Sequence, residues 1–274
     1  MKFQRNPMPR LFGDLLCLLI ILVLWPLVFI YDFIVVLPEI IERDNILHIS
    51  AVVLFIFSFV NMIANLMACT LVDTAVDREV KVPLDESAEW IYCQVCDCVT
   101  PPRSWHCKFC DVCIRKRDHH CGFTGCCIGH QNHRFFIFFL WYLFVLSAVG
   151  LVFKAAYMWS NNDFMHCWKA SMELTPIILI TGCGVWIHVQ YIIIVLNTFS
   201  LICGFLGLAC QIPMLLRGET CAEKGKQTKY NCGISYNLKT VFGERMHVAW
   251  ICPWIESQLP DDGYTTNQEF NAKN

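Results

Sequence analysis

Residues 93–127, CQVCDCVTPPRSWHCKFCDVCIRKRDHHCGFTGCC, decide what kind of domain this chain contains. The stretch holds nine of the chain's eighteen cysteines together with three histidines. Thiolate and imidazole are the ligands that zinc prefers, and Cys-x-x-Cys pairs are typical of closed tetrahedral sites. We therefore expect two structural zinc ions, with Cys98 left as a surplus thiol. Eight side chains stand at zinc spacing: Cys93, Cys96, His106, Cys107, Cys110, Cys113, His120 and Cys127.

The thiol of Cys121 is left over once these eight ligands are assigned. It ends the sequence Asp118-His119-His120-Cys121. A thiol with a free histidine and a carboxylate beside it is typical of a nucleophile whose pKa must be lowered. We therefore predict that Cys121 is a nucleophile and that His119 and Asp118 serve it.

The rest of the chain is too apolar for a soluble domain. Of its 274 residues 56% are hydrophobic and only 16% are charged, and the apolar residues come in blocks. Three blocks, Leu15–Leu37, Leu47–Val72 and Phe135–Trp159, are each long enough to cross ~30 Å of hydrocarbon at ~1.5 Å per residue. These blocks predict a multi-pass α-helical membrane protein.

A fourth block runs from Pro176 to Leu216 without a charged residue. It is compatible with one long tilted helix or with a broken pair, and Gly182 and Gly184 make a break easy. We favour a single span near Gln190–Pro213, preceded by a luminal or interfacial helix over Pro176–His188.

The basic residues predict the orientation of the four spans. They concentrate before the first span, between the second and third spans, and after the fourth, whereas the other loops carry only Arg43 and Lys169. Cytosolic loops are rich in lysine and arginine, so both termini and the cysteine-rich loop should be cytosolic. The cytosol keeps thiols reduced, which favours zinc over disulfides.

These observations predict four regions. They are an N-terminal tail with two spans (1–72), a zinc-binding catalytic domain (73–134), two further spans (135–216) and a cytosolic tail (217–274). The loop is too small for an ordinary core, and a structural zinc contributes folding free energy on the order of 10 kcal/mol in small modules. The first span lacks a cleavage pattern and should act as an uncleaved anchor.

Several motifs together resemble one known family, the DHHC-type protein S-acyltransferases (palmitoyltransferases). Thr220-Cys221-Ala222-Glu223 is similar to the Thr-Thr-x-Glu motif of that family. The match also includes Pro102-Arg103, the cysteine and histidine pattern from Cys93 to Cys127 with Asp118-His119-His120-Cys121, Asn132, Tyr230-Asn231-Cys232-Gly233, Asn237 and Val241-Phe242-Gly243.

The resemblance implies interleaved metal sites and a two-step reaction. One zinc would lie among Cys93, Cys96, His106 and Cys113, and the other among Cys107, Cys110, His120 and Cys127. A palmitoyl or other long acyl group would pass from acyl-CoA to Cys121 and then to a cysteine of a membrane-associated protein. His119 would be the base and Asp118 would orient it.

The resemblance also implies partners and a setting. The family usually sits in Golgi or ER membranes. The basic residues of the loop, Arg103, Lys108 or Arg115–Arg117, would meet the phosphates of acyl-CoA, and Phe123 would offer an aromatic surface to its apolar chain. We expect no nucleic-acid partner. Cysteines near the membrane, Cys69, Cys221 and Cys252, are candidates for acylation of the protein itself.

Three positions depart from the family pattern. Gly122-Phe123 replaces Pro-Trp, Cys126 replaces Asn, and Asp73-Thr74-Ala75 stands where Asp-Pro-Gly is usual.

Charges within the spans, Asp14, Asp32 and Lys154, are expected to reach lipid headgroups.

The alternative to an enzyme is a catalytically inactive, membrane-anchored zinc scaffold or adaptor. The intact Asp118, His119 and Cys121 argue against it.

Overall fold

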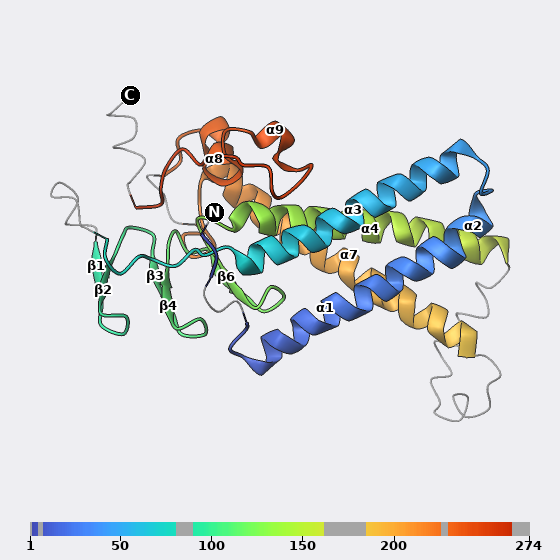
Figure 1. Cartoon of the computed structure of the whole chain (residues 1–274), viewed down its shortest axis with the longest axis horizontal. Helices are drawn as coiled ribbons and strands as arrows, with labels where there is room; N and C mark the ends of the chain where they lie inside the picture. The colour runs from blue at the N-terminus through green and yellow to red at the C-terminus, as the bar shows by residue number, and fades with distance from the viewer. Residues whose placement is uncertain (1, 5–7, 81–89, 162–184, 226–229, 265–274) are drawn as a thin grey trace. The chain divides into compact units, whose positions relative to one another are not determined.

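The computed structural model describes residues 2–4, 8–80, 90–161, 185–225 and 230–264 (Figure 1). Four helical stretches in these residues are long and apolar enough to cross a membrane, which confirms the predicted class. They are Phe12–Ile40, Ile46–Leu71, His133–Ser160 and His188–Arg217. In the first, second and fourth stretches, 22%, 17% and 22% of the most apolar window is buried, so most of their apolar surface needs lipid.

The first span is built from three consecutive helical pieces. These are α1 (Phe12–Tyr31), the π-helix η1 (Asp32–Val36) and α2 (Leu37–Ile40). A proline stands at the start of α2, directly after the π-helix. The second span is α3 (Ile46–Leu71) and the third is α4 (His133–Ser160).

The fourth span is one continuous helix, α7 (Val185–Arg217), in agreement with the predicted single crossing. The expected helix entry over Pro176–His188 falls mostly outside the described residues. The C-terminal segment adds the short helices α8 (Ile234–Phe242) and α9 (Met246–Ala249).

The chain divides into two compact units. One comprises residues 22–60 and 140–207 and contains parts of all four spans. Aromatic side chains pack these helices together: Phe29 stacks on Phe59 with ring centroids 4.1 Å apart, and Phe55 lies 5.8 Å from Phe153.

Asp32 and Lys154 form a buried ion pair in this unit, and our expectation that they reach headgroups was wrong. The Lys154 ammonium donates to Asp32 Oδ2 at 2.6 Å, and the side chains of Lys154 and Asp32 are only 3% and 6% exposed, respectively. In an apolar bundle, pairing two opposite charges costs less than burying each alone.

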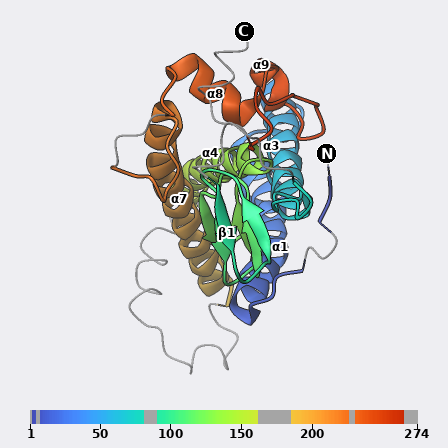
Figure 2. The ribbon, with the colours of Figure 1, turned by 90° about the vertical axis from the view of Figure 1, so that its left-hand side faces the viewer.

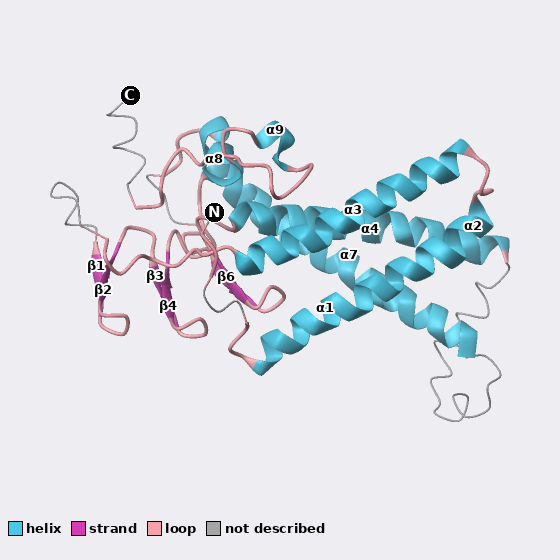
Figure 3. Cartoon of the chain, viewed as in Figure 1, coloured by secondary structure: helices cyan, strands magenta, loops and turns pink. Residues whose placement is uncertain are grey.

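The other unit comprises residues 1–21, 61–139 and 208–274 and contains the cysteine-rich module. In the described residues all six strands lie between 91 and 128 (Figure 3). They form three antiparallel hairpins, seen together in Figure 2. The strands are β1 (Ile91–Cys93), β2 (Cys98–Thr100), β3 (Trp105–Cys107), β4 (Val112–Ile114), β5 (His119–Cys121) and β6 (Cys126–Ile128).

The segment after α3 lies along the second hairpin. Ala75 bridges to Ile114, and the Val76 N–H donates to the Cys113 carbonyl at 2.8 Å. In place of the Asp-Pro-Gly turn, Asp73 Oδ1 accepts the Ala75 N–H at 3.0 Å, an Asx-turn that needs no proline.

Candidate functional site

The three hairpins repeat with a period of fourteen residues. Their first strands begin at Ile91, Trp105 and His119, and their second strands at Cys98, Val112 and Cys126. The turns repeat as well, because Asp97, Asp111 and Gly125 all have positive φ, of 50°, 55° and 64°. Sequence reasoning missed this repeat, although the spacing of the cysteines carries it.

The two predicted zinc groups are related by the same period. In each group the four ligand atoms lie within 4.8 Å of one another, as required to hold a metal ion. Every member of the first group becomes a member of the second when fourteen is added to its number. The first group is Cys93, Cys96, His106 and Cys113, and the second is Cys107, Cys110, His120 and Cys127.

Strand geometry explains why neighbouring hairpins share ligands. His106 pairs with Cys113 across the β3–β4 ladder, so both side chains lie on one face and serve the first group. Cys107 is the next residue of the strand and therefore points to the opposite face, where it serves the second group. Each hairpin thus completes the site of the hairpin before it.

Both ring nitrogens of His120 have partners: one faces the cysteine sulfurs and the other faces a carboxylate. Its Nδ1 lies 3.7, 3.3 and 3.7 Å from the sulfurs of Cys107, Cys110 and Cys127, respectively. A tetrahedral zinc site separates nitrogen and sulfur ligands by about 3.6 Å, so the described distances fit zinc. Its Nε2 lies 2.8 Å from Asp14 Oδ2, the carboxylate–histidine contact that fixes a ligand ring.

The contact with Asp14 corrects the expectation that this carboxylate reaches lipid headgroups. It also gives a reason for Gly122, since a Cβ at that position would lie 3.2 Å from Asp14 Oδ1. A larger residue would press on the carboxylate that orients His120.

Cys121 occupies the position in the third hairpin that corresponds to Cys93 and Cys107, which belong to the two metal groups. Its partners in a third group would be residues 124, 134 and 141, but these are threonine, arginine and tryptophan. Cys121 belongs to neither metal group. Its thiol is therefore available for chemistry.

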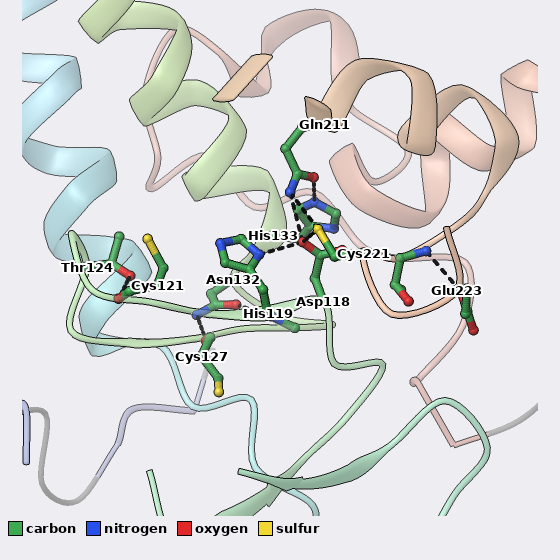
Figure 4. Close-up of polar contacts among 12 residues, drawn as sticks. Asp118, His119, Cys121, Thr124, Cys127, Asn132, His133, Gln211, Cys221 and Glu223 are labelled. Atoms are coloured by element: carbon green, nitrogen blue, oxygen red, sulfur yellow. Dashed lines mark hydrogen bonds and ion pairs between the residues drawn. The ribbon is translucent and has the colours of Figure 1, made fainter. Parts of the chain in front are cut away.

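His119 and Cys121 lie on the same face of β5 because they are two residues apart. His119 Nδ1 lies 2.6 Å from Asp118 Oδ2, and Figure 4 shows the imidazole ring between this carboxylate and the Cys121 side chain. The three residues that sequence reasoning selected are thus neighbours in the order that nucleophilic catalysis requires.

Asp118 is buried and bound by groups that sequence reasoning missed. Its side chain is 1% exposed. It accepts hydrogen bonds from Gln211 Nε2 at 2.8 Å and from the backbone N–H of Cys221 at 2.7 Å (Figure 4). Gln211 Oε1 also lies 2.9 Å from His133 Nε2. The signal for Gln211 was a polar amide inside an apolar span, which must find a partner there.

These contacts shift the pKa values of the three groups. Burial alone would raise the pKa of the Cys121 thiol, but the hydrogen bond and charge of His119 outweigh burial and lower that pKa. Burial would lower the pKa of the His119 imidazole, whereas hydrogen bonds to Asp118 and Cys121 raise it to about 12. The carboxyl of Asp118 is buried too, and the hydrogen bond to His119 holds its pKa well below the ordinary value. The proton between Asp118 and His119 therefore resides on His119, and the charged imidazole favours the thiolate form of Cys121.

Arg103 joins the hairpins to the segment after α7. Its Nε and one Nη donate to the two carboxylate oxygens of Glu223 at 2.8 and 2.6 Å, and that Nη also donates to the Gly218 carbonyl at 2.9 Å. The guanidinium lies 4.2 Å from the Tyr230 ring centroid. Its backbone has a φ of 64°, a conformation that non-glycine residues hold only when their surroundings fix them.

The two residues proposed for acyl-CoA lie in different surroundings. The guanidinium of Arg103 is engaged by Glu223, so its contact with phosphates stays a prediction. Phe123 is 42% exposed, two residues after Cys121, and presents apolar surface there.

Two asparagines hold backbone around the site. Asn132 donates to the carbonyls of Cys69 and Cys127 at 3.0 and 2.9 Å. Asn237 donates to the Leu216 carbonyl at the end of α7 at 2.8 Å and so ties the C-terminal segment to the fourth span.

Comparisons with known proteins agree with this geometry. The family model described as DHHC palmitoyltransferase matches residues 86–228, about half of the chain. The chain is 32% identical over 180 residues to the probable palmitoyltransferase ZDHHC24 of Danio rerio, a match that covers 64% of this chain and 60% of that protein. The human ZDHHC24 is 31% identical over 182 residues, with 64% and 63% covered, and that of Rattus norvegicus is 29% identical with the same coverage.

The matches thus span less than two thirds of the length of these relatives. The family model covers every residue of the three hairpins, the Asp118–Cys121 sequence and the Glu223 that binds Arg103. This chain belongs to the DHHC palmitoyltransferase family.

Proposed function

We propose that this protein is a protein S-acyltransferase that moves a long-chain acyl group, palmitoyl above all, from acyl-CoA to cysteine thiols of membrane-associated proteins. The proposal rests on the Cys121 thiol, which is not a metal ligand and has a lowered pKa. Cys121 lies outside both metal groups, and its pKa is lowered by a His119 that Asp118 holds at 2.6 Å.

In the first step the Cys121 thiolate attacks the thioester carbonyl of acyl-CoA. A carbon–sulfur bond forms to Cys121 as the bond to the coenzyme A sulfur breaks, and the departing thiolate takes the proton held by His119. The product is a thioester on Cys121. Because one thioester replaces another, this exchange needs no other energy source.

In the second step His119 accepts the proton of the incoming cysteine thiol. The resulting thiolate attacks the acyl group, and Cys121 leaves as a thiolate. Asp118 stabilises the imidazolium that exists in the resting state and again after this transfer. Its buried carboxylate, fixed by Gln211, keeps the imidazole in one orientation throughout.

Zinc in the two four-residue groups would supply fixed geometry, since four protein ligands leave no open coordination position. His120 and Cys127 would anchor the residues on both sides of Cys121. This anchoring limits the motion of the nucleophile, which is what near-attack geometry requires.

The membrane would provide the surface for the acyl chain. Each buried methylene stabilises binding by about 0.8 kcal/mol, so a chain placed among apolar helices is held without polar contacts. Phe123 would meet the chain near its thioester end. We further propose that residues 73–134 and both termini face the cytosol of Golgi or ER membranes.

The test is formation of the thioester. Purified full-length protein in detergent is incubated with labelled palmitoyl-CoA, and the label should appear on the protein and be released by neutral hydroxylamine. Cys121→Ser should lose the label. Cys126→Ser is the matched control, because Cys126 is buried, faces Cys121 across the β5–β6 ladder and belongs to neither metal group.

An unlabelled native protein that still holds two zinc ions would contradict the proposal and favour the inactive scaffold. Label that persists in Cys121→Ser would place the nucleophile elsewhere.

A further inference from the structure

Cys221 brings a second thiol to the Asp118–His119 pair. Its sulfur lies 3.3 Å from Asp118 Oδ2, beside the backbone contact already described (Figure 4). One ligand atom each from Asp118, His119 and Cys221 lies within 4.8 Å of the other two. We propose that these three side chains form a third zinc site, distinct from the two four-residue groups, which takes up zinc reversibly.

The donor set and its spacing fit zinc. An oxygen, a nitrogen and a sulfur, with one open position for water, match the three-ligand arrangement of non-structural zinc sites. A tetrahedral ion separates such ligands by about 3.5 Å. The 3.3 Å between Cys221 and Asp118 is already close to that value, and the 2.6 Å between Asp118 and His119 must open by a small rotation of the imidazole.

The site can be reached from solvent on one side. The Asp118 side chain is 1% exposed, whereas that of His119 is 28% exposed. An ion entering past His119 would meet a carboxylate already oriented by Gln211 and the Cys221 N–H. The Thr-Thr-x-Glu motif that this segment resembles has threonine at position 221, and a neutral hydroxyl is a far poorer zinc ligand than a thiolate.

The third site should bind zinc more weakly than the other two groups. It has three protein ligands instead of four, and the Lys116 ammonium lies near enough to interact with Asp118. A chelator of moderate strength should therefore empty it first.

Zinc bound there would oppose catalysis. Binding releases the protons of Cys221 and His119 to solvent and occupies both His119 and Asp118, so His119 can no longer carry the proton that the acyltransfer must move. This consequence rests on the proposed acyltransfer, whereas the binding itself does not.

The test counts zinc in the full-length protein. After equilibration in zinc buffers and gel filtration, elemental analysis of the native protein should rise from two to three zinc ions per chain. Cys221→Thr should stay at two. Cys252→Thr, which changes a cysteine of the same C-terminal region outside all three groups, should still reach three.

A second readout needs no variant. Zinc at the concentration that fills the third site should protect Cys221 of the native protein from iodoacetamide, as measured by mass spectrometry. A native protein that stops at two zinc ions, a Cys221→Thr protein that reaches three, or unprotected Cys221 would overturn the proposal.

Acyl labelling separates this inference from the proposed function. The same zinc concentration should suppress labelling of native Cys121, and a moderate chelator should restore it. A protein that binds the third zinc but never forms a thioester would contradict the proposed acyltransfer and still support the third zinc site. Labelling that is unchanged while the third zinc is bound would remove the inhibitory role.

Discussion

The protonation of Cys121 and His119 determines how this protein should respond to pH. His119 stabilises the charged form of the thiol, and Asp118 stabilises the charged form of His119. A thiol whose pKa is lowered keeps its thiolate as pH falls below the ordinary thiol value, and it loses that thiolate only when pH passes the lowered pKa.

We expect alkylation of Cys121 by iodoacetamide to reach half its maximal rate at a pH below that of an ordinary thiol and to stay on a plateau at higher pH. The reason is that the thiolate is already formed there, and His119, with a pKa of about 12, keeps its proton. The rate is measured by mass spectrometry of the peptide that contains Cys121. In His119→Gln the midpoint should move upward, and an unchanged midpoint would show that His119 does not set the pKa of this thiol.

At the residue scale, the sequence was enough to select Asp118, His119 and Cys121 but not the groups around them. Their adjacency in β5 is local, so the chain itself brings them together. Gln211 and Cys221 approach Asp118 from 93 and 103 residues away. Such contacts depend on tertiary packing, which no local pattern specifies.

At the scale of elements, the three hairpins depend on the first helix. Asp14 lies in the first turn of α1 and holds the Nε2 of His120 at 2.8 Å, and its side chain is 12% exposed. Second-sphere carboxylates of this kind typically change metal affinity by about 10–100-fold.

Asp14→Asn should therefore weaken zinc at the group containing His120 by about 10–100-fold and leave the other group intact. Zinc release to a chromophoric chelator should become biphasic, with one ion leaving early. Asp111→Asn is the control, since Asp111 lies 3.9 Å from His106 Nε2 and is 57% exposed, so it should have little effect. Equal effects of the two substitutions would contradict the role given to Asp14.

The elements themselves were largely predictable. Span length follows from hydrocarbon thickness, so four apolar blocks gave four helices with only their ends displaced. The ligand pattern predicted two metal groups, whereas the hairpins were not foreseen because three-residue strands carry almost no periodic signal.

At the scale of the whole molecule, a buried ion pair contributes to the stability of the unit formed by residues 22–60 and 140–207. Asp32 and Lys154 come from the first and third spans and are nearly inaccessible to solvent. Removing one partner leaves an uncompensated charge in apolar surroundings, which typically costs about 3–5 kcal/mol.

Asp32→Leu should thus destabilise the protein by about 3–5 kcal/mol, seen as a lower midpoint of thermal unfolding in detergent. Asp32→Leu combined with Lys154→Met should recover most of the loss, because no charge then remains buried. A double variant as unstable as the single one would show that the pair makes other essential contacts.

The fourteen-residue period has a consequence for how such a domain comes to hold a reactive thiol. In a tandem array in which each hairpin is completed by the next one, the last hairpin has a ligand position that no following hairpin completes, and here that position holds Cys121. If one hairpin were added or deleted, the incomplete metal group would lie in the new last hairpin. The reactive cysteine is thus the one in the last repeat, where no further hairpin supplies the other metal ligands. Removing or adding a repeat therefore offers a way to change which cysteine is reactive.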